Sequence, residues 1–256
     1  MKLRSFFRKI PILKRIYPSL IYRIFILFKK NFFIYKFNNI NLLLHLNDPI
    51  DRSILLFDFY ENEQIRYLNT IFKKNKINYF FDIGSNSGIY SLIIAKLYKK
   101  VNVFSFEPVK STFLKLKKNT SLNSNLKNIK KYNYGLSNKN SKLKMKAKKK
   151  NGFIQSGGFG VVEQNDSVKN LHTEYALFKR GDSEFKFKQK SICLKIDVEG
   201  HELYVLGGLN HIFKNNKIFL QIEIFPEKYN KVSKKLRNFG FTKINQINAD
   251  HYFIKN

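Results

Sequence analysis

The order of apolar and polar positions predicts alternating strands and helices along most of the 256-residue chain. Short apolar runs bounded by turn-forming residues predict strands over residues 40–46, 78–83, 101–107, 129–135, 191–197, 217–224 and 241–254. Apolar side chains at helical spacing predict helices over residues 61–74, 90–98, 111–123, 202–209 and 232–238. Strands that alternate with helices predict an α/β fold, with a mostly parallel sheet and helices on both of its faces.

Two segments depart from this alternation. Within residues 138–150, lysines occupy every second position from Lys142 to Lys148, which predicts a solvated edge strand with the lysines on one face. Residues 151–190 show little periodicity and contain a cluster of glycines. We expect them to leave the sheet as a long excursion, of the kind that forms lids and substrate loops in compact domains.

Residues 1–36 differ from the rest because they carry many bases and no acid, with apolar and aromatic residues between the bases. Their longest apolar stretch, residues 19–28, is interrupted by Arg23 and is shorter than the roughly 20 residues of a membrane span. The segment either packs on the domain or lies as an amphipathic segment on an anionic membrane. We therefore divide the chain into a basic amphipathic segment, 1–36, and one domain, 37–256.

Charge and composition bear on partners and location. The formal net charge is +30, which is typical of proteins that bind nucleic acid or anionic membranes. The chain is also crowded with Asn, Ile and Phe and lacks Trp, a bias typical of AT-rich coding sequences in which Lys fills surface positions without a binding role. The single cysteine, Cys193, excludes an internal disulfide and a cysteine-based zinc site. These features favour a cytoplasmic protein, with the inner membrane as a peripheral contact through residues 1–36.

The strongest chemical signal is an apolar strand that runs directly into a glycine turn and a helix, at residues 79–88. Gly84 and Gly88 permit a tight turn and let a ligand approach the backbone closely. Asp82 stands at the carboxyl end of the strand, where open α/β sheets bind their ligands. The spacing is neither the dinucleotide fingerprint G-x-G-x-x-G nor a phosphate-binding P-loop.

An acid follows the next predicted strand. Glu107 lies 25 residues after Asp82, about one strand–helix–strand step, where a carboxylate can accept both hydroxyls of a ribose. A competing interpretation makes Glu107 only a cap of the following helix. Because no pyrophosphate fingerprint is present, the two acids favour a nucleoside ligand without phosphates, and S-adenosylmethionine is such a ligand.

Polar residues also follow the strand predicted at residues 191–197. Asp197 would lie beside the reactive end of the cofactor, where a carboxylate attracts a sulfonium or takes a hydroxyl proton. His201 is a candidate general base near neutral pH, and Glu199 stands between the two in the chain. The crowding of acids also suits a helix start, where the dipole favours negative charge, so we expect no metal ion.

Four blocks of the sequence together resemble the FkbM-type methyltransferases. They are FDIGSNSG at residues 81–88, FEP at 106–108, KIDVEGHE at 195–202 and IEI at 222–224. The resemblance covers about residues 58–225, and it implies a class I, Rossmann-like methyltransferase fold. It also implies methyl transfer from S-adenosylmethionine, usually to a hydroxyl, with sugars, polysaccharide building blocks and polyketides as family substrates.

The resemblance also implies roles for individual residues. The cofactor turn would be lined by Asp82, Gly84, Asn86 and Gly88. Glu107 would hold the ribose, and Asp197 and Glu199 would lie at the reaction centre. Adenine contacts stay unassigned, because residues 134–137 lack the acid that such folds often carry after the third strand.

We therefore expect a methyltransferase that O-methylates a hydroxyl of a sugar, a glycan or a related metabolite. Two alternatives stay open. The charge favours an RNA or other nucleic-acid methyltransferase, although the chain has no Asn/Asp-Pro-Pro-Tyr/Phe motif for base amino groups and no catalytic Pro-Cys pair. The basic segment 1–36 favours a membrane-surface binding module with an inert methyltransferase-like domain.

Overall fold

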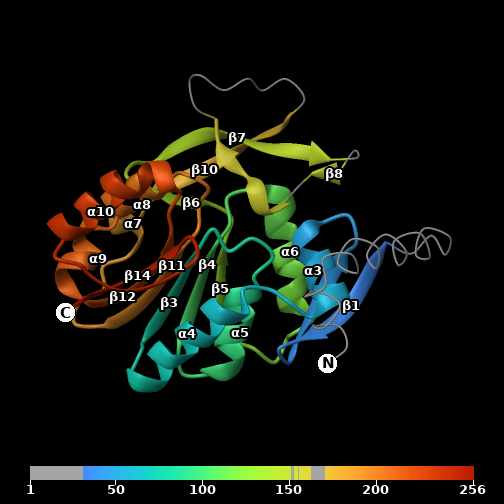
Figure 1. The fold of residues 1–256 in the computed structure, drawn as a ribbon, viewed down its shortest axis with the longest axis horizontal. Helices are drawn as coiled ribbons and strands as arrows, with labels where there is room; N and C mark the ends of the chain where they lie inside the picture. Colours follow the sequence, from blue (N-terminus) through green and yellow to red (C-terminus); the bar gives the residue numbers. More distant parts are fainter. Residues whose placement is uncertain (1–30, 151–152, 155, 163–170) are drawn as a thin grey trace.

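A seven-stranded, mostly parallel sheet forms the centre of the computed structural model, which describes residues 31–150, 153–154, 156–162 and 171–256 (Figure 1). Its strand order is β13-β14-β12-β11-β3-β4-β5. The five parallel strands are β3 (Tyr79–Ile83), β4 (Asn102–Phe106), β5 (Ile129–Tyr132), β11 (Ser191–Ile196) and β12 (Lys217–Glu223). The hairpin of β13 (Thr242–Ile247) and β14 (Asp250–Lys255) closes one side, with β14 antiparallel to β12.

Helices cover both faces of this sheet, as the alternation of elements predicts. On one face, Phe80, Cys193 and Phe219 pack against α4 (Asn62–Lys74) and α5 (Ile89–Leu97). On the other, Phe81 and Leu194 belong to the same apolar cluster as residues of α8 (Glu202–Gly207), α9 (Asn210–Asn215) and α10 (Tyr229–Asn238). The central strands are thus buried on both faces, which explains why they show as nearly continuous apolar runs.

A hairpin and a helix before the core pack on α5. The hairpin consists of β1 (Phe32–Phe37) and β2 (Ile40–His45), and the helix is α3 (Pro49–Phe57), which the apolar pattern did not predict. Asp48 caps α3 by accepting hydrogen bonds from two backbone amides of its first turn. Two asparagines of α6 (Lys110–Ser121) and the turn after it bond to the free edge of β2: Asn119 accepts from Leu43 N at 2.8 Å, and Asn123 accepts from Asn41 N at 2.9 Å.

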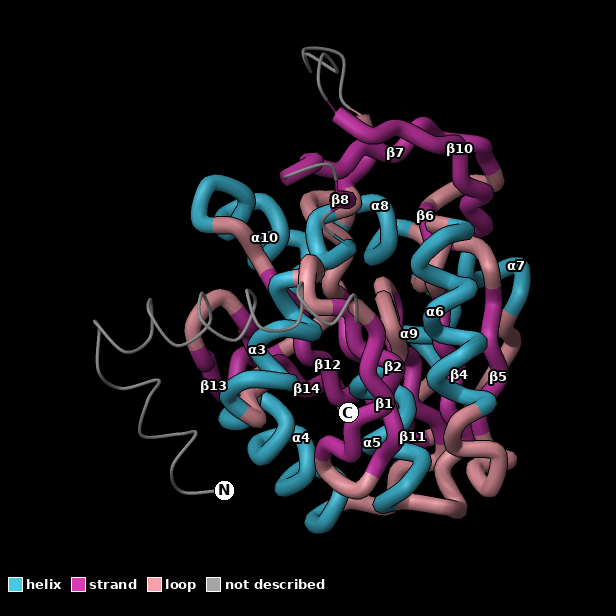
Figure 2. The backbone as a smooth tube through the Cα atoms, turned by 90° about the vertical axis from the view of Figure 1, so that its right-hand side faces the viewer, coloured by secondary structure: helices cyan, strands magenta, loops and turns pink. Residues whose placement is uncertain are grey.

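A second, smaller sheet lies across the carboxyl ends of the central strands, at the top of Figures 1 and 2, and we call it the roof sheet. Its strands are β6 (Gly135–Ser137), β7 (Ser141–Lys150), β8 (Phe153–Ile154), β9 (Gly160–Val161) and β10 (Leu171–Arg180). They follow the order β6-β10-β7-β8, and β9 also pairs with β7. A 3-10 turn, Ser156–Gly158, and the short helix α7 (Gly181–Glu184) lie within the same inserted region.

The prediction of a solvated edge strand for the lysine-rich segment was half right. The lysines of β7 do share one face, since Met145 and Ala147 between them are buried on the other. The edge position was wrong, because β7 pairs with β10 on one side and with β8 and β9 on the other. Alternating lysines indicate that one face of a strand is solvated. They do not indicate whether the backbone at the edges of the strand pairs with other strands.

Two other boundaries differ from the expected ones. The run at residues 129–135 ends its strand at Tyr132, and the side-chain amide of Asn133 donates to the carbonyls of Glu107 and Pro108. The helix expected at residues 202–209 ends at Gly207. Gly208 packs so closely on the Ser137 carbonyl that an added Cβ would lie 1.9 Å from its oxygen.

The basic segment predicted at residues 1–36 lies outside the described residues up to residue 30, and its last residues belong to β1. The described part of the chain holds no helix long and apolar enough to cross a membrane.

Candidate functional site

A pocket of about 1130 Å³, including its part open to solvent, lies between the carboxyl ends of β3, β4, β11 and β12 and the roof sheet. All eight candidate residues from the sequence are near it: Asp82, Gly84, Asn86, Glu107, Asp197, Glu199 and His201 line it, and Gly88 ends the turn beneath it. The inner face of the roof sheet supplies Met145, Val161 and Phe178. The sequence therefore identified the edge of the sheet at which the pocket forms.

The glycine turn is shaped by contact with the neighbouring strand. Gly84 has φ +80°, and a Cβ there would lie 1.8 Å from the Asp197 carbonyl oxygen. Gly88 has φ +84° and begins α5. The amides of Gly84 and Ser85 both donate to the Phe106 carbonyl at 3.0 Å, which holds the turn against the end of β4. Only glycine meets both the backbone angle and the close approach at position 84.

Asp82 fixes the helix that follows the turn. Its Oδ2 accepts from the Ser91 amide at 3.0 Å and from the Ser91 hydroxyl at 2.6 Å. The Ser91 and Ser105 hydroxyls are 2.6 Å apart, so this bond continues to β4. Burial raises the pKa of Asp82 above its usual value, and the positive charge of Lys195 opposes that shift. Asp82 thus joins the turn, α5 and β4 from below the pocket.

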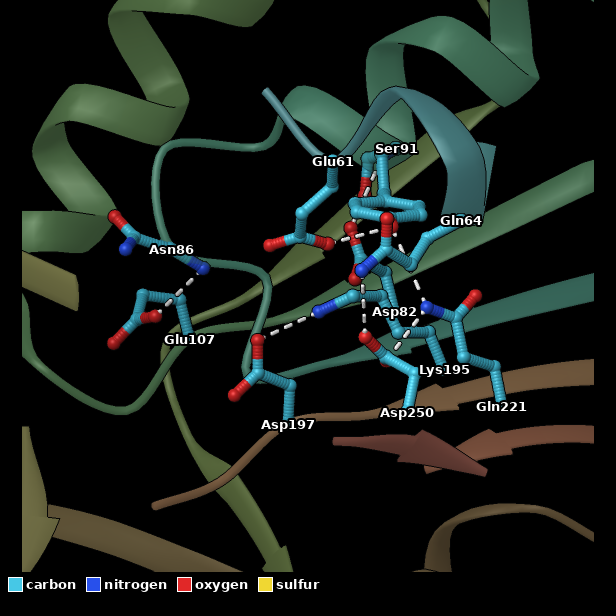
Figure 3. Close-up of polar contacts among 11 residues, drawn as sticks. Glu61, Gln64, Asp82, Asn86, Ser91, Glu107, Lys195, Asp197, Gln221 and Asp250 are labelled. Carbon is cyan, nitrogen blue, oxygen red and sulfur yellow. Dashed lines mark hydrogen bonds and ion pairs between the residues drawn. The ribbon is translucent and has the colours of Figure 1, made fainter. Parts of the chain in front are cut away.

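Glu107 holds the turn from the opposite side, as Figure 3 shows. Its two carboxyl oxygens accept from the backbone amides of Asn86 and Val109, each at 2.9 Å. Burial raises the pKa of Glu107 to about 8, although these two hydrogen bonds work against the shift. Each carboxyl oxygen keeps a second acceptor position, so a pair of ribose hydroxyls can still donate to this side chain.

Lys195 is a buried cation in the middle of the sheet. In the register of the parallel strands it pairs with Asp82 on one side and Gln221 on the other. Its Nζ donates to Asp197 Oδ2 at 2.8 Å and lies 4.7 Å from the centre of the Tyr90 ring. Burial tends to lower the pKa of Lys195, but the surrounding acids, Asp197 first, raise it well above its usual value. The lysine therefore stays charged and balances the acids around it.

Asp197 and Glu223 form a carboxyl pair at the ends of β11 and β12. Burial alone would raise the pKa of Asp197, yet Lys195 and a hydrogen bond from Glu223 bring it below its usual value. Burial and the negative charge of Asp197 raise the pKa of Glu223 to about 9. At neutral pH the proton of the pair therefore lies on Glu223, and Asp197 is ionised.

Glu61 is a pocket residue that the sequence analysis did not identify. It precedes the first turn of α4 with φ 41° and ψ 44°, and its Oε2 accepts from the Tyr90 hydroxyl at 2.6 Å. Figure 3 shows Glu61 and Asp197 between the Glu107 side of the pocket and Lys195. Burial raises the pKa of Glu61, and Lys195 opposes this. A left-handed conformation in a non-glycine residue is strained, and such strain often marks a functional position.

Glu199 and His201 lie at the edge of the pocket below the roof sheet. Glu199 adopts φ 49°, and burial raises its pKa to about 7. His201 Nε2 lies 2.9 Å from the Ser137 hydroxyl, and the imidazole stacks on Tyr204 with ring centres 4.6 Å apart. Burial and then Lys228 lower the pKa of His201 to about 4, so this side chain is neutral at pH 7. The imidazole is thus held by neighbours on two sides.

The side of the pocket next to Glu107 is apolar. Pro108, Leu136 and Phe178 line it, together with Gly135. A Cβ at Gly135 would lie 2.5 Å from the Phe178 ring, so glycine at this position allows the ring to approach the end of β6. The apolar lining suits a flat ring such as adenine. This region could not be assigned from the sequence, because the Phe178 side chain reaches it from a strand more than 40 residues later in the chain.

The open α/β sheet carries a glycine turn after β3, the acid Glu107 after β4 and the carboxylates Asp197 and Glu199 after β11. This combination defines a nucleoside-binding enzyme of the methyltransferase type. The model of the methyltransferase FkbM domain matches residues 82–243, more than half of the chain. The chain belongs to this family. It therefore has the class I fold and is an S-adenosylmethionine-dependent methyltransferase, as the sequence resemblance implied.

Individual proteins are similar over much of the chain. The hexuronic acid methyltransferase AglP of Haloferax volcanii is 27% identical over 179 residues, which are 68% of each chain. Among solved structures, the ribosomal protein L11 methylase of Lactobacillus delbrueckii subsp. bulgaricus has a TM-score of 0.46 and 13% identity, covering 77% of this chain and 79% of that one. The human methyltransferase 10 domain containing protein has a TM-score of 0.46 and 14% identity, covering 84% and 86%.

The pocket fits S-adenosylmethionine in charge and in hydrogen bonding. Six carboxyl groups line it: Glu61, Asp82, Glu107, Asp197, Glu199 and Glu223. Asp197 among them is ionised at neutral pH, which suits a ligand with a positively charged sulfur. The Ser85 hydroxyl is buried at the pocket and has no hydrogen-bond partner among the described residues, so a ligand can satisfy it. Within the described ranges, no group of three or more His, Cys, Asp or Glu is arranged to hold a metal ion.

Proposed function

We propose that this protein O-methylates a hydroxyl group of a sugar, within a glycan or a glycan precursor. The observation that carries the proposal is that Asp197 and Glu199 line the same pocket as the ribose-type acid Glu107. The name of the relative AglP, a hexuronic acid methyltransferase, supports a sugar acceptor.

The chain's own residues would hold the cofactor as follows. Gly84, Asn86 and Gly88 shape the turn, Glu107 accepts the ribose hydroxyls, and Asp82 fixes the turn from below. Glu61 and Asp197 place negative charge at the opposite end, where the sulfonium and the ammonium of the methionine part would lie. The apolar side near Phe178 would receive the adenine.

S-adenosylmethionine supplies an activated methyl group when it is bound. The chain then has to bring one acceptor hydroxyl into line with that group, and positioning of this kind accounts for much of such a rate enhancement. Asp197, kept ionised by Lys195, would accept the hydrogen bond of the hydroxyl and orient its oxygen. Glu199, with a pKa of about 7, would take the proton that leaves this oxygen. His201 would hold the edge of the acceptor site through Ser137 and Tyr204.

The test is transfer of a labelled methyl group from S-adenosylmethionine to a panel of glycosides and to RNA. We expect label in the glycosides that is stable to mild alkali, because a methyl ether on a hydroxyl resists hydrolysis. Glu199→Gln should reduce the rate constant at least about tenfold, since general-base catalysis contributes factors of that size or more. Glu227→Gln, at a surface turn, should leave it unchanged.

Three results would contradict the proposal. Label only in RNA would favour a nucleic-acid methyltransferase. Label released from the sugar by alkali would place the methyl group on a carboxylate. Binding of S-adenosylmethionine without transfer to any glycoside would remove the sugar as acceptor.

A further inference from the structure

A second cavity adjoins the cofactor pocket beneath the roof sheet. It has about 1410 Å³, including its part open to solvent, and it shares Val161, Glu199 and His201 with the cofactor pocket. The two cavities therefore lie side by side at Glu199 and His201, two of the residues expected at the reaction centre. We call the second cavity the side groove; among the residues that line it alone are Ser137, Asn138, Lys139, Ser141 and Tyr204.

Tyr204 provides a flat aromatic surface in the side groove. Its side chain is 53% exposed, although it belongs to α8 of the core. The ring stacks on His201 at an interplanar angle of 18°, and His201 is itself fixed by the hydroxyl of Ser137. An aromatic ring that is held on one face and exposed to solvent can pack against the C–H face of a sugar at little cost in side-chain entropy.

The side groove is lined or bordered by charges of both signs. Glu199 lies where the groove meets the cofactor pocket, and Lys139 lies beyond it. Lys139 is exposed and forms no ion pair or hydrogen bond with the described residues. Lys228 donates to the Gly200 carbonyl at 3.0 Å, so a second positive charge borders the groove. An acceptor that fills the groove therefore meets both an acid and positive charges.

We propose that the side groove is an acceptor subsite for a sugar that carries an anionic group, a carboxylate or a phosphate. The inference rests on the proposed function, because it places this anionic sugar next to the hydroxyl that is methylated. Tyr204 stacks on the ring, Asn138 and Ser141 bond to its hydroxyls, and Lys139 pairs with the anion. A neutral sugar makes the first two kinds of contact but not the third, so charge determines acceptor preference.

The test measures the binding of three sugar probes to the protein saturated with S-adenosylhomocysteine. Binding is measured by titration calorimetry or NMR. The probes are methyl β-D-glucuronide, methyl β-D-glucoside 6-phosphate and the neutral methyl β-D-glucoside, which differ only at C6. We expect at least one anionic probe to bind about fivefold more tightly than the neutral one, the upper range for an exposed ion pair. The better of the two anionic probes identifies the anion as a carboxylate or a phosphate.

Two variants and their matched controls assign the effect to the groove. Lys139→Gln should remove the preference for the anionic probe, and Tyr204→Ala should weaken all three probes about fivefold. The controls are Lys142→Gln and Tyr175→Ala, whose side chains are exposed on the outer face of the roof sheet and should change nothing.

Equal binding of charged and neutral probes, unchanged preference in Lys139→Gln, or no binding of any probe would overturn the subsite. These outcomes are separate from failure of the proposed function. If methyl transfer to glycosides occurs without any preference for charge, the function stands and the subsite is wrong. If S-adenosylmethionine binds and no glycoside is methylated, the function itself is wrong.

Discussion

The Tyr90 hydroxyl donates a 2.6 Å hydrogen bond to Glu61, and this bond joins the first turns of α4 and α5 beside the cofactor pocket. Glu61 is held in a left-handed backbone conformation, which keeps its carboxyl group at the pocket and away from solvent. Tyr90 also covers Lys195 with its ring. One tyrosine therefore positions both an acid and the cation that balances it.

Glu61→Gln is expected to weaken binding of S-adenosylmethionine about tenfold or more. The amide keeps an oxygen for the Tyr90 hydroxyl but loses the negative charge, and hydrogen bonds to charged groups contribute about 1.5–3 kcal/mol. Calorimetry on the variant checks this. Binding of 5′-methylthioadenosine, which lacks the sulfonium and the ammonium, should not change.

Glu63→Gln is the matched control, since Glu63 lies two residues later, in the first turn of α4, and is exposed. The affinity of this variant for S-adenosylmethionine and for 5′-methylthioadenosine should equal that of the wild type. An equal loss for both ligands in Glu61→Gln would instead mean that the pocket is disturbed, which would contradict a role in charge recognition.

Ligand affinity should depend on pH through Glu107. The pKa of this group is about 8 in the free protein, so it is mostly protonated at pH 6 and mostly ionised above pH 8. Two ribose hydroxyls donate to the ionised form, so binding favours deprotonation and releases a proton below pH 8. The association constant for 5′-methylthioadenosine, which has no amino group that titrates, should rise by up to about tenfold per pH unit from pH 6 to 8.

Calorimetry in buffers of different ionisation enthalpy measures the released proton directly. In Glu107→Gln the affinity for 5′-methylthioadenosine should be lower than in the wild type and should not change between pH 6 and 8. A wild-type affinity that falls as the pH rises would contradict the assignment of Glu107 to the ribose.

Gly84→Ala should destabilise the protein by about 3 kcal/mol or more, because φ +80° and the Asp197 carbonyl both exclude a Cβ. Unfolding in urea measures the free energy of unfolding. Gly158→Ala is the control, since an added Cβ there has no atom within 4 Å. Similar free energies for the two variants would mean that the turn can move away from β11.

Lys195→Met should lower the free energy of unfolding by about 3–5 kcal/mol at pH 7, because it leaves the buried acids around it without a partner. The loss should shrink as the pH falls, since Asp197 is then free to take a proton instead of staying ionised. Urea unfolding of Lys217→Met, an exposed lysine on the neighbouring strand β12, provides the control and should give a change below about 0.5 kcal/mol. A loss that is constant with pH would exclude an electrostatic cause.

The core strands could be predicted from the sequence because burial on both faces leaves apolar runs. Strands β3, β4 and β11 lie within a residue or so of the predicted ranges, and the polar residues that follow them meet at one pocket, as expected. The glycine turn was equally clear, since position 84 accepts no other residue without strain. The local sequence is sufficient to predict a feature where one short segment determines both its backbone conformation and the residues that it contacts.

Glu61 and the roof sheet could not be predicted in the same way. Glu61 reaches the pocket only because α4 packs beside α5, and its partner Tyr90 is 29 residues away. Lys195 could have been identified from the sequence, because it is a charged residue between Leu194 and Ile196 in a strand predicted to be buried. A buried lysine requires an acid nearby. The pairing of β7 with β10 spans the stretch that showed little periodicity, so no local pattern indicated it.

The roof sheet has a small apolar core of its own, built around Met145, Phe159 and Phe178. Among the described strands, no backbone ladder joins it to the seven-stranded sheet. The roof can therefore unfold locally while the core stays folded, and its amide hydrogens should exchange faster than those of β3 and β11. Four of its side chains, Leu136, Met145, Val161 and Phe178, line the pocket, so we expect this opening to expose the bound cofactor to solvent.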